Sequence, residues 1–170
     1  MGKLILMCGV PGSGKSTYLK VHEPWFNESH VIVSRDEIRF SLLKEGEEYF
    51  SHEKEVWKIF VDKIKDGLSK VEEVYVDATH INEHNRAKLL RALGKSMAGV
   101  ELEAIYFDLP MERILAQNAQ RTGVRFVPPS VIQNMRSTMT EPSFEEGFNR
   151  VYVVRDDGMV IRERDDVEND

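Results

Sequence analysis

The chain has 170 residues, 41% apolar and 31% charged, which is typical of one folded domain with a hydrophobic core and excludes a disordered chain. It has a single cysteine, Cys8, so an internal disulfide is excluded and we expect a reducing, cytoplasmic location. No apolar stretch is long enough to cross a bilayer, so we expect no membrane partner.

The formal net charge of −6 is concentrated near the C-terminus. Residues 156–170 contain seven acidic residues and two arginines, a net of −5, which leaves 21 basic and 22 acidic residues elsewhere, a net of −1. The acidic total is therefore compatible with a locally basic cleft, and a nucleic-acid partner is not excluded.

Short apolar runs alternate with segments of helical periodicity along the chain. Strands are predicted at 3–8, 31–33, 74–76, 100–107 and 151–154. Helices are predicted at about 15–21, 47–68, 82–97, 108–121 and 128–140. This alternation predicts an α/β fold with a mostly parallel five-stranded sheet flanked by helices. Ligands of such sheets bind outside the carboxyl ends of the strands.

A glycine-rich segment stands between the first predicted strand and helix. Residues 9–16, Gly-Val-Pro-Gly-Ser-Gly-Lys-Ser, match the pattern G-x-x-x-x-G-K-[ST] without a mismatch. Its backbone N–H groups and the helix start behind it favour phosphate binding, where an ordinary turn would not need the full pattern. Lys15 is predicted to reach the β- and γ-phosphates of ATP, and the Ser16 hydroxyl to ligate Mg²⁺. The predicted ATP contacts in this segment are Gly9, Pro11, Gly12, Ser13, Gly14, Lys15, Ser16 and Thr17.

Asp36 and Arg39 follow the second predicted strand and lie one turn apart if the segment is helical. A carboxylate here is suited to accept the proton of an attacking hydroxyl, and Arg39 to hold a substrate phosphate. On spacing alone the alternative stays open, in which Asp36 only caps a helix and Arg39 is solvated.

Further polar residues follow the third strand. Asp77 is a candidate to support Mg²⁺ or its waters, although a turn residue is the alternative. Arg86 is a candidate contact to substrate phosphate if it faces the cleft, and is otherwise part of a solvated helix face. His80 and His84 have a spacing that zinc could use on one helix, but Asn82 is expected to cap a new helix between them, so we discount metal binding there.

Arg121 and Arg125 lie in a predicted loop between two helices, with Gly123 as a pivot. An arginine that closes over ATP can stabilise the charge on a transferring phosphoryl group. Arg121 is therefore predicted to be catalytic, and both arginines to bind ATP. An ordinary basic surface loop is the alternative.

Four segments together resemble the kinase domain of bacteriophage polynucleotide 5′-hydroxyl kinase. They are the phosphate loop, Ser-Arg-Asp-Glu-Ile-Arg at 34–39, Val-Asp-Ala-Thr-His-Ile-Asn at 76–82, and Asn-Ala-Gln-Arg at 118–121 with Val127-Pro128. The similarity extends from residue 3 to about residue 140. It implies a P-loop kinase fold with a helical lid, in which Asp36 is the general base and Arg39 grips the acceptor's phosphate.

The resemblance also assigns a domain plan and an activity. Residues 1–155 are expected to form the kinase domain, with a lid at about 116–128, and residues 156–170 an acidic hairpin or tail that is partly disordered. The expected activity is transfer of the γ-phosphate of ATP to the 5′-hydroxyl of DNA or RNA. No Asp-x-Asp-Gly-Thr motif follows, so 3′-phosphatase activity is not expected.

Two alternatives remain, because the sequence shows no clear nucleic-acid-binding aromatics or basic stripe. Zeta-toxin-like and small-metabolite kinases use a related loop with a similar Asp and Arg. An ATP-binding module or ATPase without phosphotransfer would need the loop but no base facing an acceptor.

Overall fold

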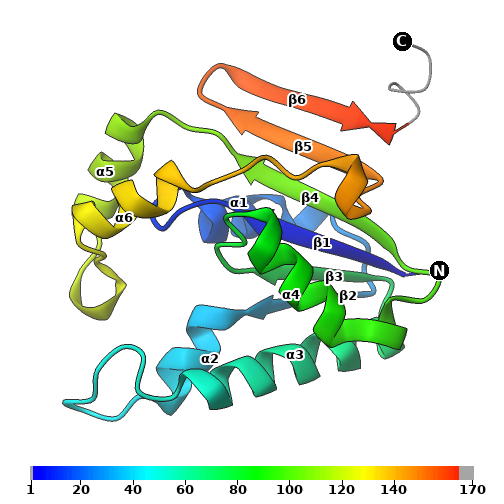
Figure 1. The fold of residues 1–170 in the computed structure, drawn as a ribbon, viewed down its shortest axis with the longest axis horizontal. Helices are drawn as coiled ribbons and strands as arrows, with labels where there is room; N and C mark the ends of the chain where they lie inside the picture. The colour runs from blue at the N-terminus through cyan, green and yellow to red at the C-terminus, as the bar shows by residue number, and fades with distance from the viewer. Residues whose placement is uncertain (1, 165–170) are drawn as a thin grey trace.

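The computed structural model of the chain describes residues 2–164, which form one mixed sheet with helices on both faces (Figure 1). Its strands are β1 (Lys3–Cys8), β2 (His30–Ser34), β3 (Glu73–Asp77), β4 (Glu101–Phe107), β5 (Arg150–Arg155) and β6 (Gly158–Glu163). They lie in the order β2-β3-β1-β4-β5-β6. The first five are parallel and β6 is antiparallel to β5, so the predicted α/β class is confirmed, with one strand added at the edge.

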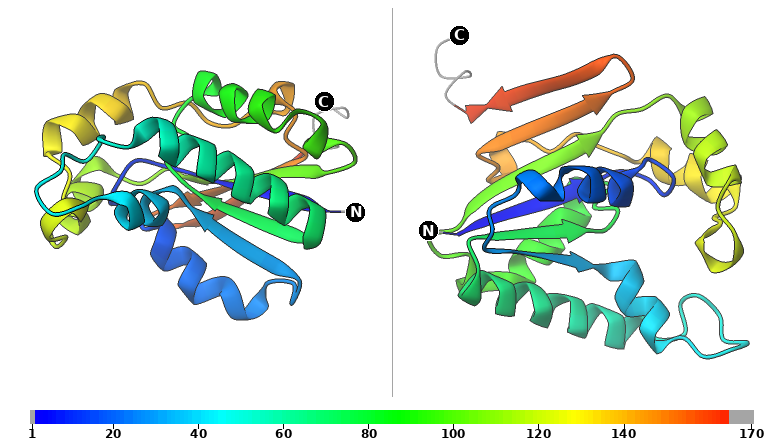
Figure 2. Two further views of the ribbon diagram at one scale, coloured as in Figure 1. Left: turned by 90° about the horizontal axis from the view of Figure 1, so that it is seen from below. Right: turned by 180° about the vertical axis from the view of Figure 1, so that it is seen from behind.

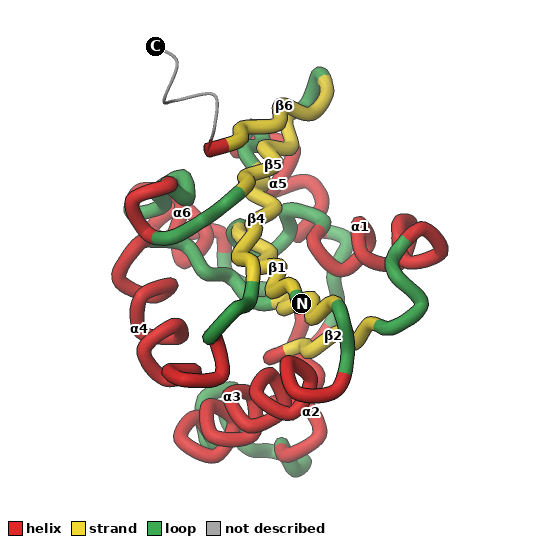
Figure 3. The backbone as a smooth tube through the Cα atoms, turned by 90° about the vertical axis from the view of Figure 1, so that its right-hand side faces the viewer, coloured by secondary structure: helices red, strands yellow, loops and turns green. Residues whose placement is uncertain are grey.

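The helices are α1 (Lys15–His22), α2 (Arg35–Leu42), α3 (Glu53–Lys70), α4 (Glu83–Leu93), α5 (Met111–Ala119) and α6 (Pro129–Ser137). Short 3-10 turns lie at η1 (Glu23–Trp25), η2 (Gly94–Met97), η3 (Gly123–Arg125) and η4 (Phe144–Glu146). Helices α3 and α4 cover one face of the sheet and α1 the other, as the views in Figure 2 and Figure 3 show.

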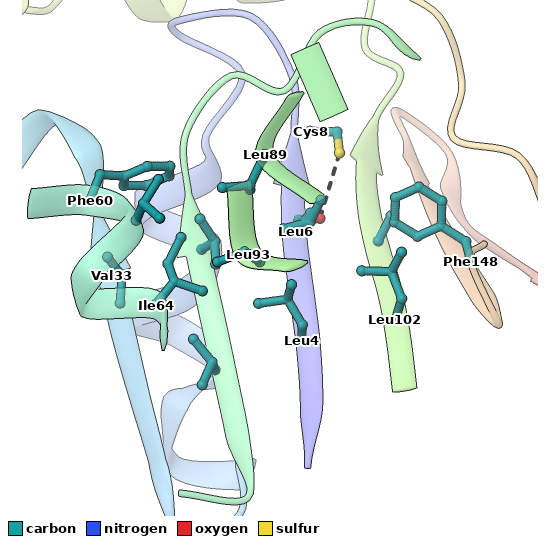
Figure 4. Packing of buried hydrophobic residues seen from close by; sticks show 14 of the residues in the cluster. Leu4, Leu6, Cys8, Val33, Phe60, Ile64, Leu89, Leu93, Leu102 and Phe148 are labelled. Carbon is teal, nitrogen blue, oxygen red and sulfur yellow. Dashed lines mark hydrogen bonds between the residues drawn. The ribbon is translucent and has the colours of Figure 1, made fainter. Parts of the chain in front are cut away.

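Strand β1 lies at the centre of the core because its side chains are buried on both faces. Leu4, Leu6 and Cys8 pack toward the face of α3 and α4, as Figure 4 shows. Ile5 and Met7 point to the opposite face, under α1. Cys8 is a fully buried core thiol, and its burial raises the pKa of the thiol to about 12.

Several boundaries differ from the sequence-based prediction. Helix α3 begins at Glu53 and not at Glu47, because Gly46 has a φ of 82° and residues 47–52 form turns. Helix α5 begins at Met111, directly after Pro110. In the β5–β6 hairpin the turn residues are 156 and 157, since Arg155 pairs with Gly158. The end of the predicted acidic tail, 165–170, lies outside the described residues. No helix within 2–164 is long and apolar enough to span a bilayer.

Candidate active site

The phosphate loop connects β1 to α1 at the carboxyl edge of the sheet. Gly12 and Gly14 have φ values of 85° and 91°, which side-chain-bearing residues rarely adopt. A Cβ on Gly12 would lie 3.0 Å from the Ile114 carbonyl oxygen, and one on Gly9 would lie 2.7 Å from Ser13 Oγ. The glycines are therefore required for the loop to close against α5 and against itself.

Lys15 is buried and its ammonium group donates to the carbonyl oxygens of Gly9, at 2.9 Å, and Val10, at 3.0 Å. Burial lowers the pKa of Lys15, and the carboxylates of Asp77 and Asp36 partly offset this effect. The charge on this ammonium therefore acts on carboxylates that follow two other strands.

Ser16 and Asp77 are joined directly, since Ser16 Oγ donates to Asp77 Oδ2 at 2.7 Å. Asp77 ends β3, next to β1 in the sheet, and pairs in register with Met7. A hydroxyl and a carboxylate at this distance form a set of hard oxygen donors that fits Mg²⁺. The two predicted metal-side residues therefore lie together.

Asp36 lies in the first turn of α2, but it does not cap that helix. The cap is Ser34, whose hydroxyl accepts a hydrogen bond from the Glu37 backbone N–H at 3.3 Å. The structural role that the sequence left open for Asp36 is thus filled by another residue. Its side chain is partly exposed, at 44%, and is available to a ligand.

One oxygen of Asp36 is held by two donors. Tyr49 Oη donates to Asp36 Oδ1 at 2.7 Å, and Arg39 Nη1 donates to the same oxygen at 2.5 Å and to Tyr49 Oη at 2.8 Å. Burial, reinforced by the Asp36 charge, raises the pKa of Tyr49, so its hydroxyl stays protonated and donates. The structure shows no donor within 2–164 on the second oxygen, Oδ2.

Arg39 is buried, and Glu53 holds its guanidinium in a two-point interaction, Nη2 to Oε1 at 2.7 Å and Nε to Oε2 at 3.2 Å. Arg35 also donates to Glu53, at 2.9 Å. This pairing leaves Arg39 with little capacity for a substrate phosphate, the role predicted from the sequence. Its contacts correspond to an arginine that positions Asp36.

The segment predicted to be a lid runs from the end of α5 through η3 to α6. Its two ends are clasped by Asn118, whose amide donates to the Val127 carbonyl at 2.6 Å and accepts from the Val127 N–H at 3.1 Å. Arg121 Nη1 is buried and has no hydrogen-bond partner within residues 2–164. The Arg121 charge also lowers the pKa of Lys15, so the lid arginine acts on the phosphate loop. Arg125 stacks over the Phe40 ring of α2, 5.2 Å from its centroid.

Arg86 is not brought into the cleft. Its guanidinium is fully buried and forms an ion pair with Glu146 at 2.7 Å. It also donates to the carbonyl oxygens of His80 and Thr140, both at 3.0 Å. These contacts tie α4 to the segment before β5, which argues against the predicted contact between Arg86 and substrate.

Three residues of the site were missed by the sequence-based reasoning: Tyr49, Glu53 and Asn118. Tyr49 and Glu53 lie 13 and 14 residues from the groups they hold, so no local spacing pattern links them. Asn118 belongs to the Asn-Ala-Gln-Arg segment that carries the resemblance. An asparagine three residues before the loop arginine was therefore a signal from which its role could have been predicted.

The fold is shared with several solved structures. The PezAT toxin–antitoxin system of Streptococcus pneumoniae superposes with a TM-score of 0.67 at 18% identity, over 93% of this chain and 70% of that one. The Pnkp1/Rnl/Hen1 RNA repair complex gives a TM-score of 0.58 at 24% identity, over 81% and 43%. A gluconokinase from Sinorhizobium meliloti 1021 gives 0.54 at 20% identity, over 91% and 82%.

Two curated proteins are similar in sequence. One is the transcription factor bHLH140 of Arabidopsis thaliana, 24% identical over 158 residues, which are 87% of this chain. The other is an L-seryl-tRNA(Sec) kinase of Methanococcus maripaludis, 28% identical over 144 residues, 82% of this chain. The matches span 15% and 53% of these relatives' lengths. A model of the AAA domain family matches residues 4–142. The chain therefore belongs to the AAA domain family and has a P-loop kinase-like fold.

Proposed function

We propose that the protein is an ATP-dependent kinase that transfers the γ-phosphate of ATP to the 5′-hydroxyl of a DNA or RNA end. The observation that carries the proposal is the state of Asp36. One of its oxygens is fixed by Tyr49 and Arg39, and the other is left to accept the proton of an acceptor hydroxyl.

The remaining groups act on the donor. The phosphate loop and Lys15 would bind the ATP phosphates, and Ser16 with Asp77 would hold Mg²⁺, which neutralises charge on the β- and γ-oxygens. Arg121 has an unused donor and would close over the transferring phosphoryl group. A switch or ATPase without an acceptor has no need for a base held in this way.

The nucleic-acid acceptor is supported by two of the similar proteins, whose names refer to an RNA repair complex and to a seryl-tRNA kinase. A small acceptor is the second candidate, because this chain covers 82% of a gluconokinase of similar fold. The two candidates share Asp36 as base and differ only in what carries the hydroxyl.

Incubation with γ-labelled ATP, Mg²⁺ and a panel of 5′-hydroxyl oligonucleotides and small sugars tests the proposal. We expect label on the oligonucleotides with wild-type protein and none with Asp36→Asn, which should still bind ATP. Label on sugars alone would show that the acceptor is a small sugar and not a nucleic-acid end. Normal transfer by Asp36→Asn, or label released only as inorganic phosphate, would contradict the mechanism.

A further inference from the structure

Three aromatic side chains lie together beside Asp36, although their positions in the sequence form no recognisable motif. We call Phe40, Tyr49 and Phe50 the aromatic platform. The Phe40 and Tyr49 rings have centroids 6.3 Å apart, and the Tyr49 and Phe50 rings 4.7 Å apart at 85°. Tyr49 thus contacts Asp36 with its hydroxyl and Phe50 with its ring.

The outer ring of the platform is uncovered. Phe50 is 68% exposed, whereas Phe60 and Phe148 are buried in the core. Its edge-to-face contact with Tyr49 does not cover the exposed face. A large apolar ring left in water beside a proposed acceptor site is available for stacking with a flat ligand.

Two arginines lie against the platform, of which Arg39 is already paired with Glu53 and Asp36. Arg39 lies 4.4 Å from the Tyr49 centroid and 5.7 Å from that of Phe50, and Arg125 lies over Phe40. Arg125 comes from the lid and has no carboxylate partner among the described residues, so its charge is available to an anionic acceptor. Aromatic faces interleaved with arginine are how single-stranded nucleic acids are bound, with bases on the rings and phosphates on the cations.

We propose that the aromatic platform stacks the nucleobase of the acceptor's terminal nucleotide, beside the hydroxyl that Asp36 deprotonates. This inference rests on the proposed function and adds a base-binding subsite to it, with Phe50 as the specificity-determining residue. The platform is sequence-tolerant, since every base offers a flat face. It therefore favours acceptors with a terminal base over base-free sugars.

Two 5′-hydroxyl oligonucleotides test the subsite, identical except that the terminal nucleotide of one is abasic. Phe50→Ala should lower kcat/KM for the base-bearing acceptor roughly tenfold, mainly through KM, and leave the abasic one unchanged. Phe50→Trp should preserve the preference. Trp25→Ala removes another exposed aromatic ring, in η1, and should leave kcat/KM unchanged for both acceptors.

If Phe50→Ala changes kcat/KM by the same factor for both acceptors relative to the wild type, or changes it for neither, the subsite is overturned and the kinase proposal stays intact. If the wild-type protein phosphorylates neither oligonucleotide, the proposed function fails, and a binding titration decides the subsite separately. In that titration the added Phe50→Trp fluorescence should be quenched by the base-bearing oligonucleotide only. Equal response to both, or none, would overturn the subsite.

Discussion

At the scale of single residues, the two oxygens of Asp36 are in different environments. Oδ1 accepts from Tyr49 and Arg39, and these contacts hold the carboxylate in one orientation. Hydrogen bonds to a charged group are stronger than neutral ones, so the fixed oxygen acts as an anchor. The other oxygen is then presented in a constant direction, which a general base needs because proton transfer depends on geometry before pKa.

Removing the Tyr49 hydroxyl should therefore slow transfer without affecting ATP binding. In Tyr49→Phe we expect kcat to fall about tenfold, since one hydrogen bond to the carboxylate is lost, with KM for ATP unchanged. Steady-state kinetics with whichever acceptor the labelling assay selects measure both values. Tyr75→Phe is a matched control, because its hydroxyl donates to Glu73, outside the cleft, at 3.3 Å. A similar loss in both variants would mean that the effect is not specific to Asp36.

At the scale of elements, the lid is a loop whose ends are fixed and whose middle carries the cations. Asn118 joins the end of α5 to Val127 with two hydrogen bonds. Gly123, with a φ of 60°, allows the chain to turn between Arg121 and Arg125. Fixed ends limit the positions that the arginines can take, so the proposed closure over ATP would need little reordering.

Asn118→Ala should loosen this loop. Loss of two net hydrogen bonds of about 1 kcal/mol each raises the open fraction roughly tenfold or more. We expect faster tryptic cleavage after Arg121 and Arg125, measured by mass spectrometry, and a higher KM for ATP. Asn134→Ala, an exposed amide on α6, is the control and should leave cleavage unchanged. Cleavage of Asn118→Ala at the wild-type rate would show that the clasp does not hold the lid.

At the scale of the whole molecule, a buried polar cluster connects the halves of the domain. Arg86 in α4 pairs with Glu146 in η4, and both side chains are almost fully buried. His80, at the carboxyl end of the sheet, bonds through Nδ1 to the Met7 carbonyl at 2.8 Å. Met7 is in β1, directly before the phosphate loop, so this cluster supports the floor of the active site.

Breaking the buried ion pair should cost stability more than binding. Arg86→Leu leaves the Glu146 carboxylate buried without its partner, and we expect the free energy of unfolding to fall by about 3–5 kcal/mol. Urea denaturation followed by circular dichroism measures the change. The double variant Arg86→Leu/Glu146→Leu should recover much of it. If Arg86→Leu is as stable as the wild type but binds the acceptor more weakly, the original prediction that Arg86 contacts the substrate would be supported instead.

His80 should make the fold sensitive to acid. Burial lowers its pKa from 6.5 to about 4, so the unfolded chain takes up a proton first as the pH falls. The stabilisation is present above pH 6.5 and is lost between about pH 6.5 and 4, up to about 3 kcal/mol. Denaturation at a series of pH values measures it. His80→Asn should flatten that region, and Asn tolerates the φ of 41° found here. An unchanged slope in the variant would exclude His80 as the cause.

The strand-and-loop framework could be predicted from the sequence because its signals are local. Each of these signals spans only a few consecutive residues: the five apolar runs, the phosphate loop and the cap at Asn82. Hydrophobic patterning and turn chemistry were therefore sufficient to predict them. Asp36 and Arg121 were proposed as site residues from their positions after a strand and after a helix, and their roles stay predictions. The register that places Asp77 beside Ser16 follows from the parallel sheet.

The sequence by itself determined that this protein has a parallel α/β sheet with a complete phosphate loop at its carboxyl edge. Only the tertiary structure decided how the polar residues are used. Both Arg39 and Arg86 were predicted to bind substrate phosphate through their guanidinium groups. In the structure Glu53 pairs with Arg39 and Glu146 pairs with Arg86, and neither glutamate is a sequence neighbour of its arginine. Because a charged group is committed by its partners in space and not by its neighbours in sequence, these roles required the folded chain.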